Sequence, residues 1–266
     1  MRYIVPKQRL DPALLEPLRA NPMFAKVKHE HLAQLVRHAS RVRYRAGRKI
    51  LREGDEAGDV FLLVSGGVRI YHLAPDRSGG EIVVKLFRAP AFFGEMELLI
   101  GISWLETVET VLPSEVIRIR GAAFKAMLQK DQSLAMALIK DLALRLCIAT
   151  EHARVLAFSS AEARLASLMV DHVNLFGARD ESNGFIRLDV KLSQEVLARS
   201  LAVSRKTINQ TIGAWSQRGI MMKQAGRYFV QDLDALQALA IEATYGLAYE
   251  LTAGGGSTSH PAASSP

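Results

Sequence analysis

The chain has 266 residues, of which 49% are hydrophobic and 23% charged, and its formal net charge is +7. This length is typical of two domains, and the apolar content excludes a largely disordered chain. The single cysteine, Cys147, excludes a disulfide framework, a cysteine-built zinc site and a four-cysteine iron–sulfur cluster. No apolar run is long enough to span a membrane and the N-terminus lacks a signal-peptide pattern, so we expect a cytoplasmic protein.

Positive charge is concentrated near the N-terminus. Residues 1–50 carry 12 Lys/Arg against 3 Asp/Glu, whereas residues 51–158 carry 12 against 14. Such a balance permits nucleic-acid binding without establishing it. One basic run alternates along an expected strand, which favours a solvated face over a patch that contacts phosphate or protein: Arg41, Arg43, Arg45, Arg48 and Lys49.

The first segment, from about residue 11 to residue 40, has apolar residues at helical spacing. Pro12 and Pro22 stand where we expect helices to start, with Asp11 and Asn21 as their caps.

Residues 42–119 have a different sequence pattern, in which short strand-like runs are separated by glycines. The runs span residues 48–54, 60–71, 81–87 and 115–119. Closely spaced hairpins of this kind indicate an antiparallel, jelly-roll-like β-roll, which we place at residues 20–121 together with its flanking helices.

A long helix is predicted over residues 122–158. Along it, apolar residues recur at alternating steps of three and four, as in a helix–helix dimer: Ile139, Leu142, Leu146, Ala149, Ala153 and Leu156. The alternative is an amphipathic core helix whose stripe the roll covers, but the small Ala149 and Ala153 favour the dimer. Cys147 is expected to pack near this seam as a small hydrophobe rather than to act as a redox sensor.

A second domain is predicted at residues 160–235. Ser159 and Ser160 mark a hinge and the next helix cap, and the chain beyond is expected to be helical except for one hairpin between Gly219 and Val230. The Gly/Ser-rich stretch 251–266 is predicted to be a disordered tail.

Two short helices joined by a tight connection are predicted within this domain. Ser193 caps the first and Ser204 caps the second, and residues 199–203 connect them. Together with the hairpin that follows, this order is typical of a winged helix-turn-helix. An ordinary helical hairpin with a solvated polar face is the alternative, which the caps, connection and wing in sequence disfavour.

The second helix carries side chains suited to base edges in the major groove. Arginine can bond guanine bidentately, and asparagine or glutamine can bond adenine. We therefore predict a reading face that consists of Arg205, Lys206, Asn209 and Gln210. Phosphate contacts are predicted for Ser193, Gln194, Ser204 and Thr207, and for Lys223 and Arg227 of the wing.

Residues 20–232 resemble the Crp/Fnr family of bacterial transcription regulators. The resemblance rests on five stretches in the family's order: Asn21-Pro-Met-Phe, residues 44–55 from Tyr44-Arg-Ala-Gly, Phe61-Leu-Leu-Val-Ser-Gly-Gly-Val-Arg-Ile, Phe92-Phe-Gly-Glu-Met and Val203-Ser-Arg-Lys-Thr-Ile. It implies a cyclic-nucleotide-binding-type roll, a long dimerisation helix, a winged helix that binds double-stranded DNA, and RNA polymerase as a partner.

The resemblance also implies roles for single residues. Gly94, Glu95 and Met96 match the start of the family's phosphate-binding cassette, and Thr150 matches half of the pair that contacts adenine. Arg205 matches the family's base-reading arginine. Where members often carry Glu and a second Arg, this chain has Lys206 and Gln210, so the family's familiar target sequences do not carry over. Ala202 replaces the common turn glycine, which a helix-like turn would accommodate.

The same comparison predicts that the roll does not bind cyclic AMP in the family's manner. Binding members hold the cyclic phosphate with an Arg-Ser pair about ten residues after Gly-Glu, but residues 94–117 contain no Lys or Arg, and Glu106 falls in that region. Losing a charge-assisted contact weakens binding roughly ten- to a hundredfold. Binding would require a basic residue from elsewhere, such as Arg69 or Arg145.

Two other function classes are disfavoured. A cupin-type metalloenzyme needs a His-x-His pair within the strands, but His29 and His31 fall in the helical segment and the roll holds only His72, which is also the only candidate haem ligand there. A roll that binds a ligand or partner without binding DNA is disfavoured by the face from Arg205 to Gln210. We therefore expect no enzyme activity, no iron–sulfur cluster and no metal, but a homodimeric regulator with an unidentified effector at most.

Overall fold

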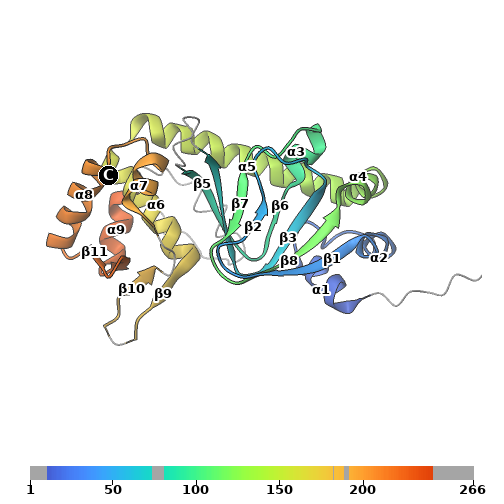
Figure 1. The fold of residues 1–266 in the computed structure, drawn as a ribbon, viewed down its shortest axis with the longest axis horizontal. Helices are drawn as coiled ribbons and strands as arrows, with labels where there is room; N and C mark the ends of the chain where they lie inside the picture. The colour runs from blue at the N-terminus through green and yellow to red at the C-terminus, as the bar shows by residue number, and fades with distance from the viewer. Residues whose placement is uncertain (1–10, 74–80, 182, 189–191, 242–266) are drawn as a thin grey trace, which may run out of the picture.

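The computed structural model describes residues 11–73, 81–181, 183–188 and 192–241. The predicted tail, 251–266, lies outside the described residues. Figure 1 shows a β-roll with short helices at one end, a long helix along one side and a smaller, mainly helical domain at the other end. The predicted α+β class, with its antiparallel roll and winged helix-turn-helix, is confirmed.

The N-terminal helices pack on the roll through the apolar faces that their spacing predicts. These helices are α1 (Pro12–Ala20) and α2 (His29–Val36). Asp11 caps α1 as predicted, accepting a hydrogen bond from the Ala13 amide at 2.9 Å. The prediction of a helix start at Asn21 and Pro22 is wrong. Asn21 instead accepts from the Met23 amide at 2.9 Å, an interaction that stabilises a turn rather than a helix.

The roll consists of two four-stranded antiparallel sheets. The first has the order β1-β8-β3-β6, with strands Ala39–Tyr44, Ser114–Arg120, Asp59–Ser65 and Ala91–Phe93. The second has the order β2-β7-β4-β5, with strands Lys49–Leu51, Thr107–Thr110, Gly67–Leu73 and Glu81–Arg88. Their apolar side chains form one core cluster that includes Phe61, Leu63, Val68, Ile70 and Phe93.

The run predicted as one strand at residues 60–71 is two strands in different sheets. The chain turns at Gly66, where φ is +90°, and a Cβ at this position would lie 2.3 Å from Ser114 Oγ. The turn therefore requires glycine for both its backbone conformation and its lack of a side chain. As a result, one apolar run supplies both sheets of the roll.

The helix predicted over 122–158 is two helices, α4 (Gly121–Lys130) and α5 (Gln132–Phe158). Asp131 separates them with an extended backbone and caps α5 by accepting from the Ser133 and Leu134 amides at 3.0 and 3.2 Å. Burial raises the pKa of Asp131, but hydrogen bonds from Ser133, His31 and two backbone amides outweigh it and hold that pKa well below its usual range. A charged cap therefore fixes where the long helix begins.

In the described residues of the C-terminal domain, four helices pack with a four-stranded antiparallel sheet. The helices are α6 (Ala161–Phe176), α7 (Gln194–Ser200), α8 (Arg205–Gln217) and α9 (Leu233–Ile241). The sheet order is β11-β12-β10-β9, with strands Met221–Gln224, Arg227–Val230, Ile186–Leu188 and Gly177–Arg179. The last two strands were not predicted, because each has three residues and too little alternation to identify.

The roll and the C-terminal domain contact each other directly. Arg88 of β5 donates to the Leu175 carbonyl of α6 at 2.7 Å, and Leu86 packs against the core of the C-terminal domain. Ser160 caps α6 directly after α5 ends, as predicted, by accepting from the Ala163 amide. Within the described residues, no helix combines the length and apolar character needed to cross a bilayer.

Candidate nucleic-acid interface and roll cavity

The helix-turn-helix is organised by two serine caps, both in the predicted positions. Ser193 Oγ accepts from the Val196 amide at 3.1 Å, and Ser204 Oγ accepts from the Thr207 amide at 3.0 Å. Each cap satisfies an amide that the first helical turn leaves without a partner. The two helices therefore start at fixed points, and α8 presents its first turn to the surface.

The connection between α7 and α8 contains a left-handed residue. Ala202 has a φ of +52°, so the expectation that a helix-like turn accommodates alanine here is wrong. The turn keeps the conformation for which glycine is suited, and the Val203 amide donates to the Ala198 carbonyl at 3.0 Å across it. The alanine therefore introduces strain into the turn.

Relief of this strain gives a stability prediction. Replacing Ala202 with Gly should raise the free energy of unfolding by about 1 kcal/mol, because glycine adopts positive φ without steric cost. The matched control is Ala214→Gly, at an exposed position inside α8. Because glycine is unfavourable inside a helix, this variant should lower the free energy of unfolding by about 1 kcal/mol. Thermal unfolding of both variants measures the two effects, and equal destabilisation by both would contradict the strain.

The predicted reading face of α8 is exposed along its length. Ile208, Ile212 and Trp215 are buried in the domain core. The four predicted base-reading side chains project instead to the surface: Arg205, Lys206, Asn209 and Gln210. Figure 1 shows α8 at the outer end of the domain, away from the roll. Among the described residues, this face of the helix is therefore open to a groove of DNA.

The C-terminal end of α8 is hydrogen-bonded to α6. Trp215 Nε1 donates to Glu162 Oε1 at 2.8 Å, and Arg218 Nη1 lies 3.1 Å from the same oxygen. These bonds join the far end of the reading helix to the start of the helix that follows the hinge. A rotation of α6 about the hinge would therefore carry α8 with it.

The small polar residues predicted to contact phosphate surround the start of each helix. The Ser204 and Thr207 hydroxyls bond each other at 2.8 Å, so a phosphate contact by either one competes with that bond. Gln194 is half-buried at the start of α7, and Ser193 is exposed.

The wing is a hairpin of β11 and β12 whose turn lies at Ala225 and Gly226, both at positive φ. Lys223 is exposed on β11, with its Nζ 5.3 Å from the centre of the Tyr228 ring, and Arg227 is exposed at the start of β12. Both predicted backbone-contacting cations therefore flank the turn of the wing.

The predicted dimer seam is largely open to solvent in the single chain. Ile139 and Leu146 are 57% and 68% exposed, and Ala149 and Ala153 are exposed as well. Leu142 is half-buried against the roll, and the side chain of Leu156 lies outside the described residues. Cys147 is exposed, so the expectation of a packed thiol is wrong for the single chain.

A small cavity lies in the described part of the roll, at the start of α3 (Glu95–Ile100), with a volume of about 30 Å³. By comparison, 10–15 Å³ on this measure holds one water molecule. Its lining combines apolar and charged side chains: Leu51, Ile70, Lys85, Phe87, Phe93, Gly94, Glu95, Met96, Glu97, Trp104, Glu106, Val108 and Arg145. We call this space the roll cavity.

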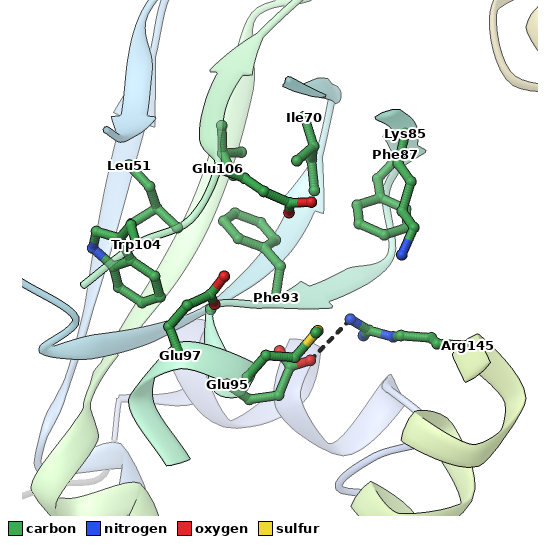
Figure 2. Close-up of a pocket in the computed structure, with 13 residues that line it drawn as sticks. Leu51, Ile70, Lys85, Phe87, Phe93, Glu95, Glu97, Trp104, Glu106 and Arg145 are labelled. Carbon is green, nitrogen blue, oxygen red and sulfur yellow. Dashed lines mark hydrogen bonds and ion pairs between the residues drawn. The ribbon is translucent and has the colours of Figure 1, made fainter. Parts of the chain in front are cut away.

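Arg145 of α5 reaches the roll cavity, but its donors are engaged (Figure 2). It bonds Glu95 Oε1 at 2.9 Å and the Phe92 carbonyl at 2.7 Å, and it forms an ion pair with Asp141 Oδ2 at 2.7 Å. Burial raises the pKa of Glu95, and Arg145 opposes that rise. The arginine that sequence analysis named as a candidate phosphate partner therefore serves three acceptors of its own chain.

Glu106 also lines the roll cavity, in the region where the sequence lacks the family's phosphate-binding arginine. Burial raises the pKa of its carboxyl, while His72 and Lys85 lower it. His72 Nε2 is 3.7 Å from Glu106 Oε1. The other named arginine, Arg69, does not line the cavity and bonds Glu81 and Glu109 instead.

The structure brings only part of the predicted effector site together. Gly94, Glu95 and Met96 line the roll cavity, whereas Thr150 does not, and its hydroxyl donates to the Leu146 carbonyl at 2.9 Å. Sequence analysis missed Lys85, Glu97 and Trp104, because only the folded roll brings these residues together around the cavity. No group of three potential metal ligands occurs within the described part of the chain.

Comparison with known proteins places this architecture in a family. Residues 41–131 match the family model of the cyclic nucleotide-binding domain, and residues 163–239 match the Crp-like helix-turn-helix domain. Together the two matches cover well over half of the chain, in the order seen in the fold. The chain belongs to the Crp/Fnr family of transcription regulators.

Individual relatives are distant. The chain is 22% identical over 214 residues to the CRP-like cAMP-activated global transcriptional regulator of Mycobacterium tuberculosis, covering 80% of this chain and 94% of that protein. It is 26% identical over 201 residues to the cAMP-activated global transcriptional regulator Vfr of Pseudomonas aeruginosa, covering 73% and 90%.

Solved structures support the same fold. A CRP-family transcriptional regulator from Thermus thermophilus matches with a TM-score of 0.63 at 24% identity, covering 75% of this chain and 96% of that one. A putative Crp/Fnr-family regulator from Eubacterium rectale matches with a TM-score of 0.67 at 16% identity, covering 83% and 98%.

Proposed function

We propose that this transcription regulator acts in the cytoplasm as a homodimer and reads a specific sequence of double-stranded DNA through α8. The observation that carries the proposal is the exposed polar face that begins with Arg205 and ends with Gln210, on a helix anchored by a cap at one end and by Glu162 at the other. Exposed arginine and amide side chains on such a helix are the groups that discriminate base pairs. The proposal assigns no catalytic activity to the chain.

The dimer follows from the exposed stripe on α5. Pairing two copies of this helix would remove Ile139, Leu146 and the two small alanines from water, which is favourable in proportion to the apolar area buried. The twofold axis would then place two α8 helices in successive major grooves about one helical turn (~34 Å) apart. RNA polymerase is a further partner proposed from the family alone.

Sequencing of captured genomic DNA tests this function. The purified full-length protein is mixed with sheared genomic fragments at physiological salt, and bound fragments are recovered and sequenced. We expect enrichment of an inverted repeat whose half-site centres lie about 10–10.5 base pairs apart. Even coverage without a shared motif would contradict the proposal and favour a roll that binds a ligand or partner without DNA.

We also propose that cyclic AMP is not the effector in the manner of the relatives whose names state cAMP activation. The region after Gly94 supplies no arginine for the cyclic phosphate and places Glu106 in the roll cavity instead. Arg145, the cation available from α5, would have to give up contacts with Glu95, Asp141 and Phe92 to serve a phosphate.

Calorimetry gives the corresponding prediction. Titration of the protein with cyclic AMP or cyclic GMP should show no micromolar binding, because the missing charge-assisted contact alone weakens affinity roughly ten- to a hundredfold. Micromolar affinity for either nucleotide would overturn this part of the proposal and would mean that Arg145 or Lys85 changes partners on binding.

A further inference from the structure

The roll cavity is surrounded by more negative than positive charge. Its lining holds three carboxyl groups and two basic side chains: Glu95, Glu97 and Glu106 against Lys85 and Arg145. Arg145 pairs with Glu95 and Asp141, which leaves the carboxyl groups of Glu97 and Glu106 opposite Lys85. An anionic ligand would therefore meet net repulsion in this space.

Two carboxyl groups at the cavity have acceptors that no donor of the described residues uses. Glu97 is only 8% exposed as a residue, and its carboxyl group has no hydrogen bond or ion pair in the described part of the chain. Glu95 is fully buried, and its Oε2 lacks a hydrogen bond among the described residues although Oε1 accepts from Arg145. A buried acceptor without a donor is costly, so Glu95 Oε2 favours a donor at the cavity, and Glu97 is available to accept from the same one.

Figure 2 shows how these groups converge. The carboxyl groups of Glu97 and Glu106 point into the roll cavity from one side, and the Lys85 and Arg145 side chains approach from the other. The remaining wall is apolar and includes three aromatic side chains, of which Phe93 and Trp104 are both at most 5% exposed. Aromatic faces attract cations as well as apolar groups.

We propose that the roll cavity binds a small organic cation: a protonated amine whose ammonium group bonds Glu97 and Glu106 and whose apolar part lies against Phe93 and Trp104. Ammonium N–H groups supply a donor to Glu97 and a closer charged partner to Glu106 than His72 at 3.7 Å, and the positive charge balances the net negative charge of the site. The inference deepens the proposed function, since it names the class of effector, but its binding test is independent of DNA.

Three ligands of nearly equal shape test the sign of the ligand charge. Ethylamine, ethanol and acetate, which are small enough for a cavity of about 30 Å³, are titrated into the full-length protein, with binding followed by calorimetry and by tryptophan fluorescence. We expect the amine to bind at least tenfold more tightly than the alcohol, and the carboxylate not to bind measurably. Equal affinity for amine and alcohol, tighter binding of the carboxylate, or no binding of the amine would each overturn the inference.

Conservative variants locate the ammonium group. Glu97→Gln and Glu106→Gln should each weaken ethylamine binding roughly tenfold or more while leaving ethanol binding unchanged. Glu16→Gln, the same chemical change at an exposed position on α1, is the matched control and should alter neither. Unchanged amine affinity in both cavity variants would place the ligand elsewhere and overturn the inference.

The dependence on pH supplies a second signature. Burial raises the pKa of Glu95 and of Glu106, so both lose their protons at higher pH than usual, and a cation binds their ionised forms. Amine affinity should therefore increase from pH 5 to pH 7, and a decrease would contradict the assigned carboxylates.

DNA binding separates failure of this inference from failure of the proposed function. The Gln variants should bind captured genomic fragments as the wild type does when no amine is present, which also shows that they fold. Normal DNA binding without amine binding would remove only the organic-cation effector.

Discussion

Replacing Ala149 with Glu should convert the protein from a dimer to a monomer. Ala149 is exposed on α5 in the single chain, and the twofold axis of the proposed dimer would bring the two copies of this residue together. Two glutamates placed there would lose their hydration and repel each other, at a cost on the order of several kcal/mol. Sedimentation velocity at micromolar concentration measures the change in mass.

Cys147→Glu is the matched control for this variant. It introduces the same charge on the same helix at an exposed position that adjoins the heptad seam but is not one of its repeating apolar positions. We expect it to remain dimeric. An unchanged dimer in both variants would show that α5 does not form the interface.

Replacing Arg205 with Ala should weaken binding to the best captured DNA fragment by about 1–3 kcal/mol, which corresponds to roughly 5- to 150-fold. Arg205 stands in the exposed first turn of α8, directly after the Ser204 cap, where a guanidinium can reach the edge of a guanine. The loss should be concentrated at one base pair in each half-site, so the variant should also discriminate less there. Fluorescence anisotropy with single-base variants of the fragment measures both effects.

Lys223→Ala distinguishes base reading from attraction to phosphate. Lys223 is exposed on the wing, so removing its charge should weaken binding evenly across all sequences and reduce the salt dependence by about one unit. If Arg205→Ala showed this even pattern instead, Arg205 would contact the DNA backbone and the assigned reading face would be wrong.

The fold was largely predictable from sequence because its boundaries are set by local signals. Serine caps, apolar periodicity and glycine turns located α6, α7, α8 and most roll strands. The element boundaries that were predicted wrongly are determined by contacts between residues that are distant in the sequence. Asp131 breaks the long helix through bonds to backbone amides and to His31, a partner 100 residues away. Gly66 divides one apolar run because of its contact with Ser114, which sequence spacing does not show.

The reading face of α8 and the roll cavity differ in how well they can be predicted from the sequence. The reading face lies on a single helix, so a period of 3.6 residues places Lys206 and Gln210 opposite the buried Ile208, while Arg205 is exposed in the first turn. The roll cavity draws on several separate segments, and its acidic character emerges only when Lys85, Glu97 and Arg145 come together around it. The strained turn at Ala202 was misjudged because an alanine gives no local sign of positive φ.

Methylation interference at guanine N7 tests most directly whether two α8 helices read successive major grooves. Fragments of the best captured sequence are methylated sparsely at N7, which lies in the major groove, and are separated into bound and free pools. We predict two interfering guanines, related by the twofold axis and about 10–10.5 base pairs apart, both lost in Arg205→Ala. Interference at a single position, at none, or at the same positions in wild type and variant would contradict DNA reading by a dimer through Arg205.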